Sequence, residues 1–146
     1  MEDAFSVETN HFGTINVARD QIITVPQGLL GFPDCQRFIL IEHQKESPFH
    51  WFQCLDNPGL AFVIIDPRSI VSDYRIGRLN SYLRELGAES ADDLQVFVIV
   101  TIPRQRPQEM TANLLGPLLI NTKNRQAKQV VLDIPRLSHQ YRIIKR

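Results

Sequence analysis

The chain has 146 residues, a length typical of one domain that buries most of its apolar surface. Hydrophobic residues make up 43% and charged residues 22% of it, which excludes disorder over the whole length. Its 16 basic and 16 acidic side chains cancel, so the composition gives no broad electrostatic footprint for nucleic acid or for an anionic membrane. The scattered Lys and Arg residues of the C-terminal third are typical of a solvated face.

The N-terminus and the cysteines predict a cytoplasmic protein without a membrane segment. Residues 1–9 are acidic and polar, and they lack the basic start and the apolar run of a secretion signal. No run approaches the roughly 18 apolar residues that a membrane-spanning helix needs. Cys35 and Cys54 do not form a metal-ligand pair, so we expect two free thiols in a reducing compartment.

Short apolar runs punctuated by nine prolines predict strands joined by turns. Residues 1–11 are expected to form a loosely ordered N-terminal segment. The Asp-Asn-Pro-Gly sequence at residues 56–59 suits a tight reversal of the backbone. The predicted strands are, in chain order, residues 14–18, 21–25, 37–42, 50–55, 60–66, 95–102, 117–121 and 126–132.

One segment, which follows the first five of these strands, has helical periodicity. Leu79, Leu83 and Leu86 are spaced at i, i+4 and i+7, and this spacing places them on one face of a helix of about three turns. Gly87 then supplies the left-handed residue that commonly ends a helix. We expect this helix to cover one end of the sheet.

Two strands are apolar without alternation, at residues 62–65 and 96–100. Such runs are typical of strands that are covered on both faces, as when a sheet curls on itself. We therefore predict a mostly β fold, with residues 1–146 in a single domain. Its architecture would be an antiparallel, β-barrel-like sheet with one short helix.

No motif for catalysis, cofactor binding or metal binding stands out. The Gly-Leu-Leu-Gly sequence at residues 28–31 lacks the Lys and Ser/Thr of a phosphate-binding loop, so we interpret it as a turn. Asp66 and Asp73 are the best acid–base candidates, but Asp66 precedes Pro67 after a strand and has the features of a turn initiator. The histidines are too dispersed for a metal site: His11, His43, His50 and His139. We expect no enzyme, no cofactor and no metal.

Several segments, taken in order, resemble the FliW family of flagellar assembly factors. The resemblance covers roughly residues 12–143, and no single motif in it is decisive. The segments are residues 12–15 (FGTI), 26–32 (PQGLLGF), 48–54 (PFHWFQC), 60–67 (LAFVIIDP) with Tyr74, 110–114 (MTANL), 116–121 (GPLLIN) and 129–132 (QVVL).

The resemblance implies both a fold and a function. Members of the family are compact, antiparallel, β-barrel-like domains without enzymatic activity. They bind the translational regulator CsrA and so relieve its repression of flagellin mRNA. Flagellin competes for the same protein and sequesters it. Neither direct nucleic-acid binding nor membrane binding is expected.

The candidate partner-binding residues have structural alternatives. Four aromatic residues near turns could line a groove for an amphipathic helix or belong to the core. The amides and the Asp-Pro pair could contact a partner, or they could fix turns and bulges through side-chain to backbone hydrogen bonds. The candidates are Phe32, Pro33, Phe49, Trp51, Asp66, Pro67, Tyr74, Asn113 and Asn121.

Two other functions compete with this one. The first is a small β-barrel module that binds nucleic acid directly, which would show binding that weakens steeply with salt. The second is a small hydrolase that uses Asp66 or a cysteine.

Overall fold

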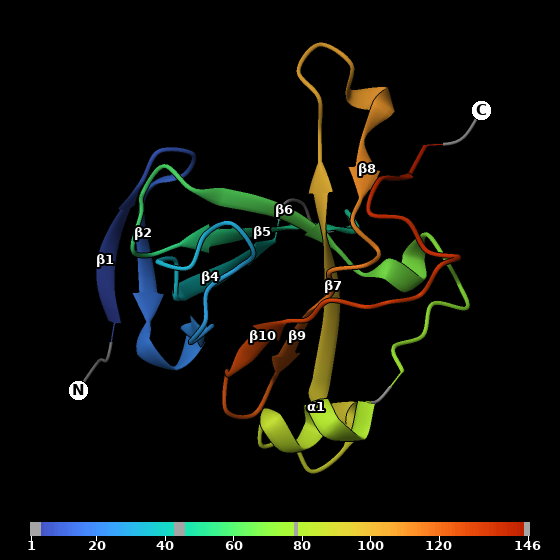
Figure 1. Cartoon of the computed structure of the whole chain (residues 1–146). Helices are drawn as coiled ribbons and strands as arrows, with labels where there is room; N and C mark the ends of the chain where they lie inside the picture. Colours follow the sequence, from blue (N-terminus) through green and yellow to red (C-terminus); the bar gives the residue numbers. More distant parts are fainter. Residues whose placement is uncertain (1–3, 43–45, 78, 145–146) are drawn as a thin grey trace.

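The computed structural model describes residues 4–42, 46–77 and 79–144 (Figure 1). In this part of the chain it has eleven strands, four short 3-10 turns and one α-helix, α1 (Leu79–Glu85). A mostly β fold with one helix is therefore confirmed. The strands are β1 (Ala4–Thr9), β2 (Gly13–Ala18), β3 (Ile23–Thr24), β4 (Arg37–Glu42), β5 (Phe49–Cys54), β6 (Ala61–Ile65), β7 (Leu94–Thr101), β8 (Thr111–Ala112), β9 (Leu118–Asn121), β10 (Ala127–Gln129) and β11 (Tyr141–Arg142).

The main sheet is antiparallel, with the strand order β10-β9-β7-β6-β5-β4-β3. A barrel-like closure is not confirmed, because the described strands form no continuous closed ladder. An isolated bridge joins Thr24 of the last strand to Gln126, the residue before the first one, and Thr24 donates its backbone N–H to the Arg125 carbonyl at 2.9 Å. The sheet is thus strongly bent, so that its two ends approach each other.

Strand β7 is covered on both faces, as its apolar sequence predicts. Phe97 belongs to one hydrophobic core, together with Phe38, Phe52 and Ile64. Val98, the next residue, belongs to a second core on the opposite face. Alternate side chains of a strand point to opposite faces, so one strand serves both cores. Figure 1 shows β7 running from the α1 end of the molecule into the projecting loop before β8.

Residues 1–11 were expected to form a loosely ordered segment, and the part of it that the structure describes contains a strand. Residues 4–9 form β1, which pairs with β2 in antiparallel register over six residue pairs. Alternation of Phe5 and Val7 with polar neighbours gives β1 one apolar face, the pattern of a half-buried strand. The Asn10 N–H bonds to the Pro58 carbonyl at 3.0 Å and ties the hairpin to the turn after β5.

Other boundaries also differ from the expected ones. The helix is shorter than three turns, since it ends at Glu85 and buried Leu86 follows it. Gly87 has a φ of +68°, which confirms the left-handed stop. Strand β3 has two residues instead of the expected five, and β8 and β11 were not expected. His43 lies outside the described residues. The described part of the chain holds no helix with the length and apolar character of a membrane span.

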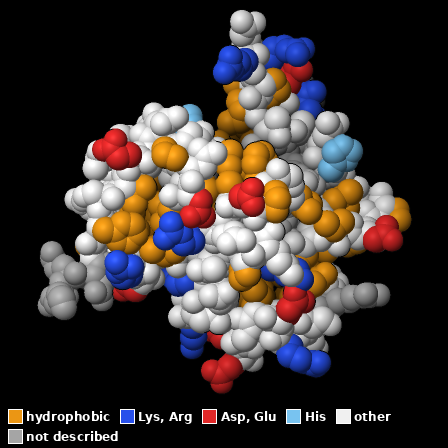
Figure 2. Space-filling model, turned by 60° about the vertical axis from the view of Figure 1, so that its left-hand side comes forward, with side chains coloured by type: hydrophobic (Ala, Val, Ile, Leu, Met, Phe, Trp, Pro, Cys, Tyr) orange, Lys and Arg blue, Asp and Glu red, His pale blue; other side chains and the backbone are white. Residues whose placement is uncertain are grey.

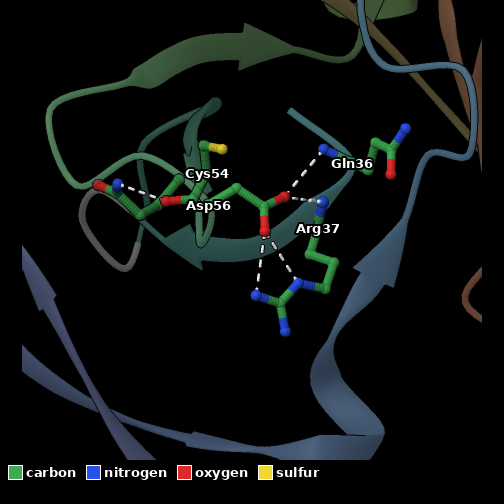
Figure 3. A network of polar contacts seen from close by, with 5 residues as sticks. Gln36, Arg37, Cys54 and Asp56 are labelled. Atoms are coloured by element: carbon green, nitrogen blue, oxygen red, sulfur yellow. Dashed lines mark hydrogen bonds and ion pairs between the residues drawn. The ribbon is translucent and has the colours of Figure 1, made fainter. Parts of the chain in front are cut away.

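Asp56 fixes the turn after β5 against the start of β4, as Figure 3 shows. Its carboxylate accepts the backbone N–H groups of Gln36 at 3.1 Å and Arg37 at 3.0 Å, and the Arg37 Nε–H at 3.0 Å. Partial burial alone would raise the pKa of Asp56, but these hydrogen bonds and the Arg37 charge outweigh it and lower that pKa.

Candidate protein-binding groove

A groove with a volume of about 660 Å³ lies on the outer surface beside β6 and the C-terminal half of β7. One wall comes from the foot of the β7–β8 hairpin, and the other from the turn at residues 28–32. Figure 2 shows hydrophobic side chains gathered at the foot of the projecting hairpin. The lining residues are Leu30, Phe32, Trp51, Ala61, Phe62, Val63, Ile99, Val100, Thr101, Ile102, Thr111, Asn113, Gln129, His139 and Gln140.

The groove combines apolar side chains with uncharged polar ones and has no fixed charge. Its lining contains no Asp, Glu, Lys or Arg, and its one titratable side chain is His139. Leu30, Phe32 and Ile102 line it although they are 57%, 40% and 43% exposed. Large apolar side chains that stay exposed side by side in a concave surface are typical of a protein-binding site.

A smaller pocket of about 200 Å³ continues the groove at the foot of the hairpin. It shares Trp51, Val63 and Ile102 with the groove, and Phe49 and Met110 complete it. All five lining residues are hydrophobic. We call it the side pocket. Its size and lining suit one large apolar anchor from a partner.

The turn that displays Leu30 and Phe32 is held rigidly by backbone hydrogen bonds. The Phe32 N–H donates to the Leu29 carbonyl at 2.7 Å, and Leu29 itself is buried in the core. Gly28 has a φ of +67°, and a Cβ there would stand 2.4 Å from the Phe32 carbonyl oxygen. Only glycine therefore fits at position 28. The interpretation of residues 28–31 as a turn is confirmed.

Gln129 connects this turn to the other end of the sheet. Its Oε1 accepts the Leu30 N–H at 2.8 Å, and its Nε2 donates to the Gly116 carbonyl at 3.0 Å. The Phe32 ring meets the Phe62 ring edge-on, with centroids 5.2 Å apart. The groove wall is thus fixed by one polar and one aromatic contact.

Trp51 lies between the groove and the turn of the N-terminal hairpin. The His11 ring stacks against it with centroids 5.9 Å apart, and the Phe12 ring meets it edge-on at 5.5 Å. Trp51 is half-buried and lines both the groove and the side pocket. The turn of this hairpin, whose first strand lies in the segment that was expected to be loose, therefore contacts the central aromatic residue of the site.

Four of the nine predicted contact residues come together here. Phe32, Trp51 and Asn113 line the groove, and Phe49 lines the side pocket. Pro33 is exposed and follows Phe32 in the chain. Partner contact by these residues stays a prediction, but the structure gives them one common surface.

Tyr74 lies elsewhere, in the second core. It is 4% exposed, and its hydroxyl donates to the Leu114 carbonyl at 2.7 Å. Burial raises the pKa of Tyr74 well above its usual value. Of the two roles that the sequence left open for Tyr74, core or groove, the structure gives it a core position.

The Asp-Pro pair also lies away from the groove. Asp66 caps a short 3-10 turn by accepting the Arg68 N–H at 2.9 Å, and Pro67 is buried within that turn. Asp66 and Arg68 line a separate cavity of about 260 Å³, next to one of about 330 Å³ that Arg68 shares with Asp92. These cavities carry charges of both signs, unlike the groove.

The two asparagines form side-chain to backbone hydrogen bonds, one of the two roles that the sequence left open for them. Asn121 is buried; its Nδ2 donates to the Leu86 carbonyl at 3.0 Å and its Oδ1 accepts the Lys123 N–H at 2.9 Å. Asn113 Oδ1 accepts the Leu115 N–H at 3.1 Å. Asn113 has this structural role and also lines the groove, whereas the side chain of Asn121 is too buried to contact a partner.

The two cysteines that were considered for hydrolysis are buried. Burial, with the neighbouring Cys54 thiol and nearby carboxylates, raises the pKa of Cys35 to about 12. Both cysteines are free and buried, as expected for reduced thiols. A thiol with that pKa stays protonated at neutral pH and is a poor nucleophile. The described residues contain no group of three potential metal ligands.

Leu30, Ile102 and Gln129 belong to the site, and the sequence did not single them out. The one available signal was the pair Leu29-Leu30 between two glycines, because a tight turn can bury only one of two successive side chains. Nothing local marks Gln129, since its partner Leu30 lies 99 residues away.

Comparison with known proteins identifies the relatives of this fold. The family model described as "FliW protein" matches residues 6–143. The chain belongs to the FliW family. The flagellar assembly factor FliW of Alkaliphilus metalliredigens is 44% identical over 128 residues, which cover 87% of this chain and 78% of that protein. The FliW of Leptospira biflexa is 42% identical over 126 residues, 86% of this chain and 82% of the relative.

A solved structure agrees with the FliW assignment. The crystal structure of the flagellar assembly factor FliW superposes with a TM-score of 0.87 at 30% sequence identity. The match covers 97% of this chain and 99% of that one. The resemblance inferred from the sequence is therefore confirmed.

Proposed function

We propose that this FliW-family protein is a non-enzymatic flagellar assembly factor that works in the cytoplasm by binding two proteins, CsrA and flagellin. Binding to CsrA would relieve repression of flagellin mRNA, and flagellin would sequester the protein. The observation that carries the proposal is the uncharged groove with Leu30, Phe32 and Ile102 exposed in it.

The groove suits an amphipathic helix as the bound element. A helix laid in a groove presents apolar side chains at i, i+3, i+4 and i+7, which need a long apolar trough and a deeper anchor pocket. The apolar side chains of the groove would form this trough. The side pocket, with Phe49 and Met110, offers the anchor position. A rigid wall limits the entropy lost on binding.

Direct RNA binding is the less favoured alternative. Phosphate groups are bound by Lys and Arg, and the lining of the groove has neither. RNA mobility shifts with this protein alone, weakening steeply with salt, would favour that alternative.

Calorimetric titration with CsrA and flagellin of the same organism tests the proposal. We expect tight binding of CsrA that flagellin displaces. The variant Ile102→Asp places a charge at the junction of groove and side pocket and should weaken binding by about tenfold or more. Val131→Asp is the matched control, because Val131 is 67% exposed and does not line the groove. Absence of binding by the unaltered protein, or equal effects of both variants, would contradict the proposal.

A further inference from the structure

The loop between β7 and β8 adds charge to one wall of the uncharged groove. Ile102 and Met110 at its foot line the groove or the side pocket, and residues 103–109 form its end, which we call the tip. Arg104 and Arg106 are exposed on the tip. Figure 2 shows basic side chains on the end of the projecting hairpin, directly beyond the hydrophobic side chains at its foot.

The tip is held in shape by its own backbone. The Arg106 N–H donates to the Pro103 carbonyl at 3.3 Å, and the Met110 N–H to the Pro107 carbonyl at 3.1 Å. The prolines limit the backbone further, and Gln105 sits in the left-handed region with a φ of +69°. The two guanidinium groups are therefore displayed from a folded turn.

One of the two tip arginines has a carboxylate partner within the chain. Glu109 pairs with Arg106 at 3.5 Å, but the two side chains are 37% and 65% exposed, so water and salt screen the pair. The tip thus carries two arginines against one carboxylate. The groove lining below it contains no carboxylate. A ligand that extends from the groove past Ile102 and over the tip would therefore meet a net positive charge.

We propose that the groove selects an amphipathic helix with acidic side chains along the flank that faces the tip, where they pair with Arg104 and Arg106. The proposal rests on the binding role proposed above for the groove. Guanidinium groups form charge-assisted, bidentate bonds with carboxylates, and they speed association through long-range attraction. The same arginines would repel a helix with a basic flank and so weaken its binding.

Two matched synthetic peptides test this charge selection. They share one amphipathic helical design and one apolar face, contain no tryptophan, and carry either glutamates or lysines along one flank. We expect the acidic peptide to bind about tenfold more tightly than the basic one at low salt, with the difference shrinking as salt rises. Fluorescence anisotropy of dye-labelled peptides measures both affinities.

Two double variants assign the preference to the tip. Arg104→Glu with Arg106→Glu should reverse the order of the two peptides. Arg75→Glu with Arg84→Glu changes the net charge equally, at exposed residues outside the groove lining, and should leave the order unchanged. Ile102→Ala should weaken both peptides alike, because it removes a shared apolar contact without adding a charge.

Several results would overturn the proposal. These are equal affinities for the two peptides, no binding of either, or a preference that survives the change of both tip arginines. Sedimentation velocity of the protein alone tests a second copy as the occupant. A dimer that Ile102→Asp dissociates would assign the groove to self-association and would also overturn it.

A failure of the charge selection can be distinguished from a failure of the proposed function. Titration of the unaltered protein with CsrA and flagellin tests the function without reference to the tip. If both bind and the tip variant binds the peptides with unchanged preference, the function stands and the charge selection is wrong.

Discussion

Gly28 illustrates how a single backbone position shapes the groove. Its positive φ and the closeness of the Phe32 carbonyl leave no room for a side chain. The turn it permits buries Leu29 and exposes Leu30 and Phe32 to the groove. The recognition surface thus depends on a residue that contributes no side chain to it.

We predict that Gly28→Ala lowers the free energy of unfolding by about 2 kcal/mol or more, because backbone strain and a clash with backbone atoms act together. Gly13→Ala separates the two effects, since Gly13 also has positive φ, at +66°, but its Cβ would meet nothing within 4 Å. That variant should cost only about 1 kcal/mol, the strain alone. Urea denaturation followed by circular dichroism measures both. Equal losses would show that the clash is relieved by movement of the loop.

Asp56 should make the free energy of unfolding depend on pH in the acid range. The folded structure lowers the pKa of Asp56 through Gln36 and Arg37, so its ionised form stabilises the fold. That contribution is fully present above the unfolded pKa of about 4 and is lost as the pH falls through the lower folded pKa. The free energy of unfolding of Asp56→Asn should therefore lie furthest below that of the unaltered protein at neutral pH, and the gap should close in acid.

Urea titrations from pH 7 to about pH 3 check this. Asp73→Asn is the control, because Asp73 is exposed and makes no hydrogen bond or ion pair given for the described residues. A gap between Asp56→Asn and the unaltered protein that stays constant down to pH 3 would contradict the role given to the Asp56 carboxylate.

Among the secondary-structure elements, the positions of strands could be predicted where the sequence contains an uninterrupted run of apolar residues. β7 was predicted at residues 95–102 and lies at Leu94–Thr101. Its apolar run at residues 96–100 contributes side chains to both cores. β1 was not predicted, although its apolar residues alternate with polar ones, because it lies in an acidic and polar segment near the chain end that was expected to be loosely ordered. β8 and β11 have two residues each, so neighbouring strands rather than their own sequence define them.

Element positions depend on contacts that no local pattern reveals. The turn at residues 28–32 was predictable from its glycines, but its attachment to the end of β10 through Gln129 was not. Likewise, Tyr74 could be core or groove until the Leu114 carbonyl, 40 residues on, was seen to accept its hydroxyl. The sequence thus predicted which residues lie near turns and left open which surface each turn faces.

The Gln129 contact yields a prediction for the groove wall. In Gln129→Ala, the Leu30 N–H loses its acceptor and the turn loses its link to Gly116. We expect faster hydrogen exchange at the Leu30 amide and weaker partner binding by about threefold to tenfold, with a small change in global stability. Gln140→Ala is the matched control, since Gln140 lines the groove and its side chain makes no hydrogen bond given for the described residues. Unchanged exchange at Leu30 would show that the turn is rigid without Gln129.

For the whole molecule, the bent sheet brings distant segments to one surface. The groove combines residues from the first third of the chain, from β5 to β7, and from the C-terminal segment that supplies His139 and Gln140. The family and the mostly β fold could be inferred from segments in order along the chain. The groove could not, because its lining residues come from segments far apart in the chain, and Trp51 in it contacts His11 and Phe12 of the N-terminal hairpin.

Trp51 fluorescence can report directly on binding in the groove. Trp51 is the one tryptophan of the chain, and it lines both the groove and the side pocket. A helix that fills the groove removes water from the exposed part of its indole ring. We predict that adding the tryptophan-free acidic peptide shifts the emission of Trp51 to shorter wavelength, with a midpoint equal to the dissociation constant from anisotropy.

The same titration separates groove binding from binding elsewhere. Val131→Asp should give the full emission shift, and Ile102→Asp should need about tenfold more peptide to reach it. Phe49→Ala enlarges the side pocket next to Trp51. It should weaken binding of the peptide and leave the direction of the Trp51 emission shift unchanged. Binding seen by anisotropy without any change in Trp51 emission would place the helix outside the groove, and the exposed Leu30, Phe32 and Ile102 would then need another occupant.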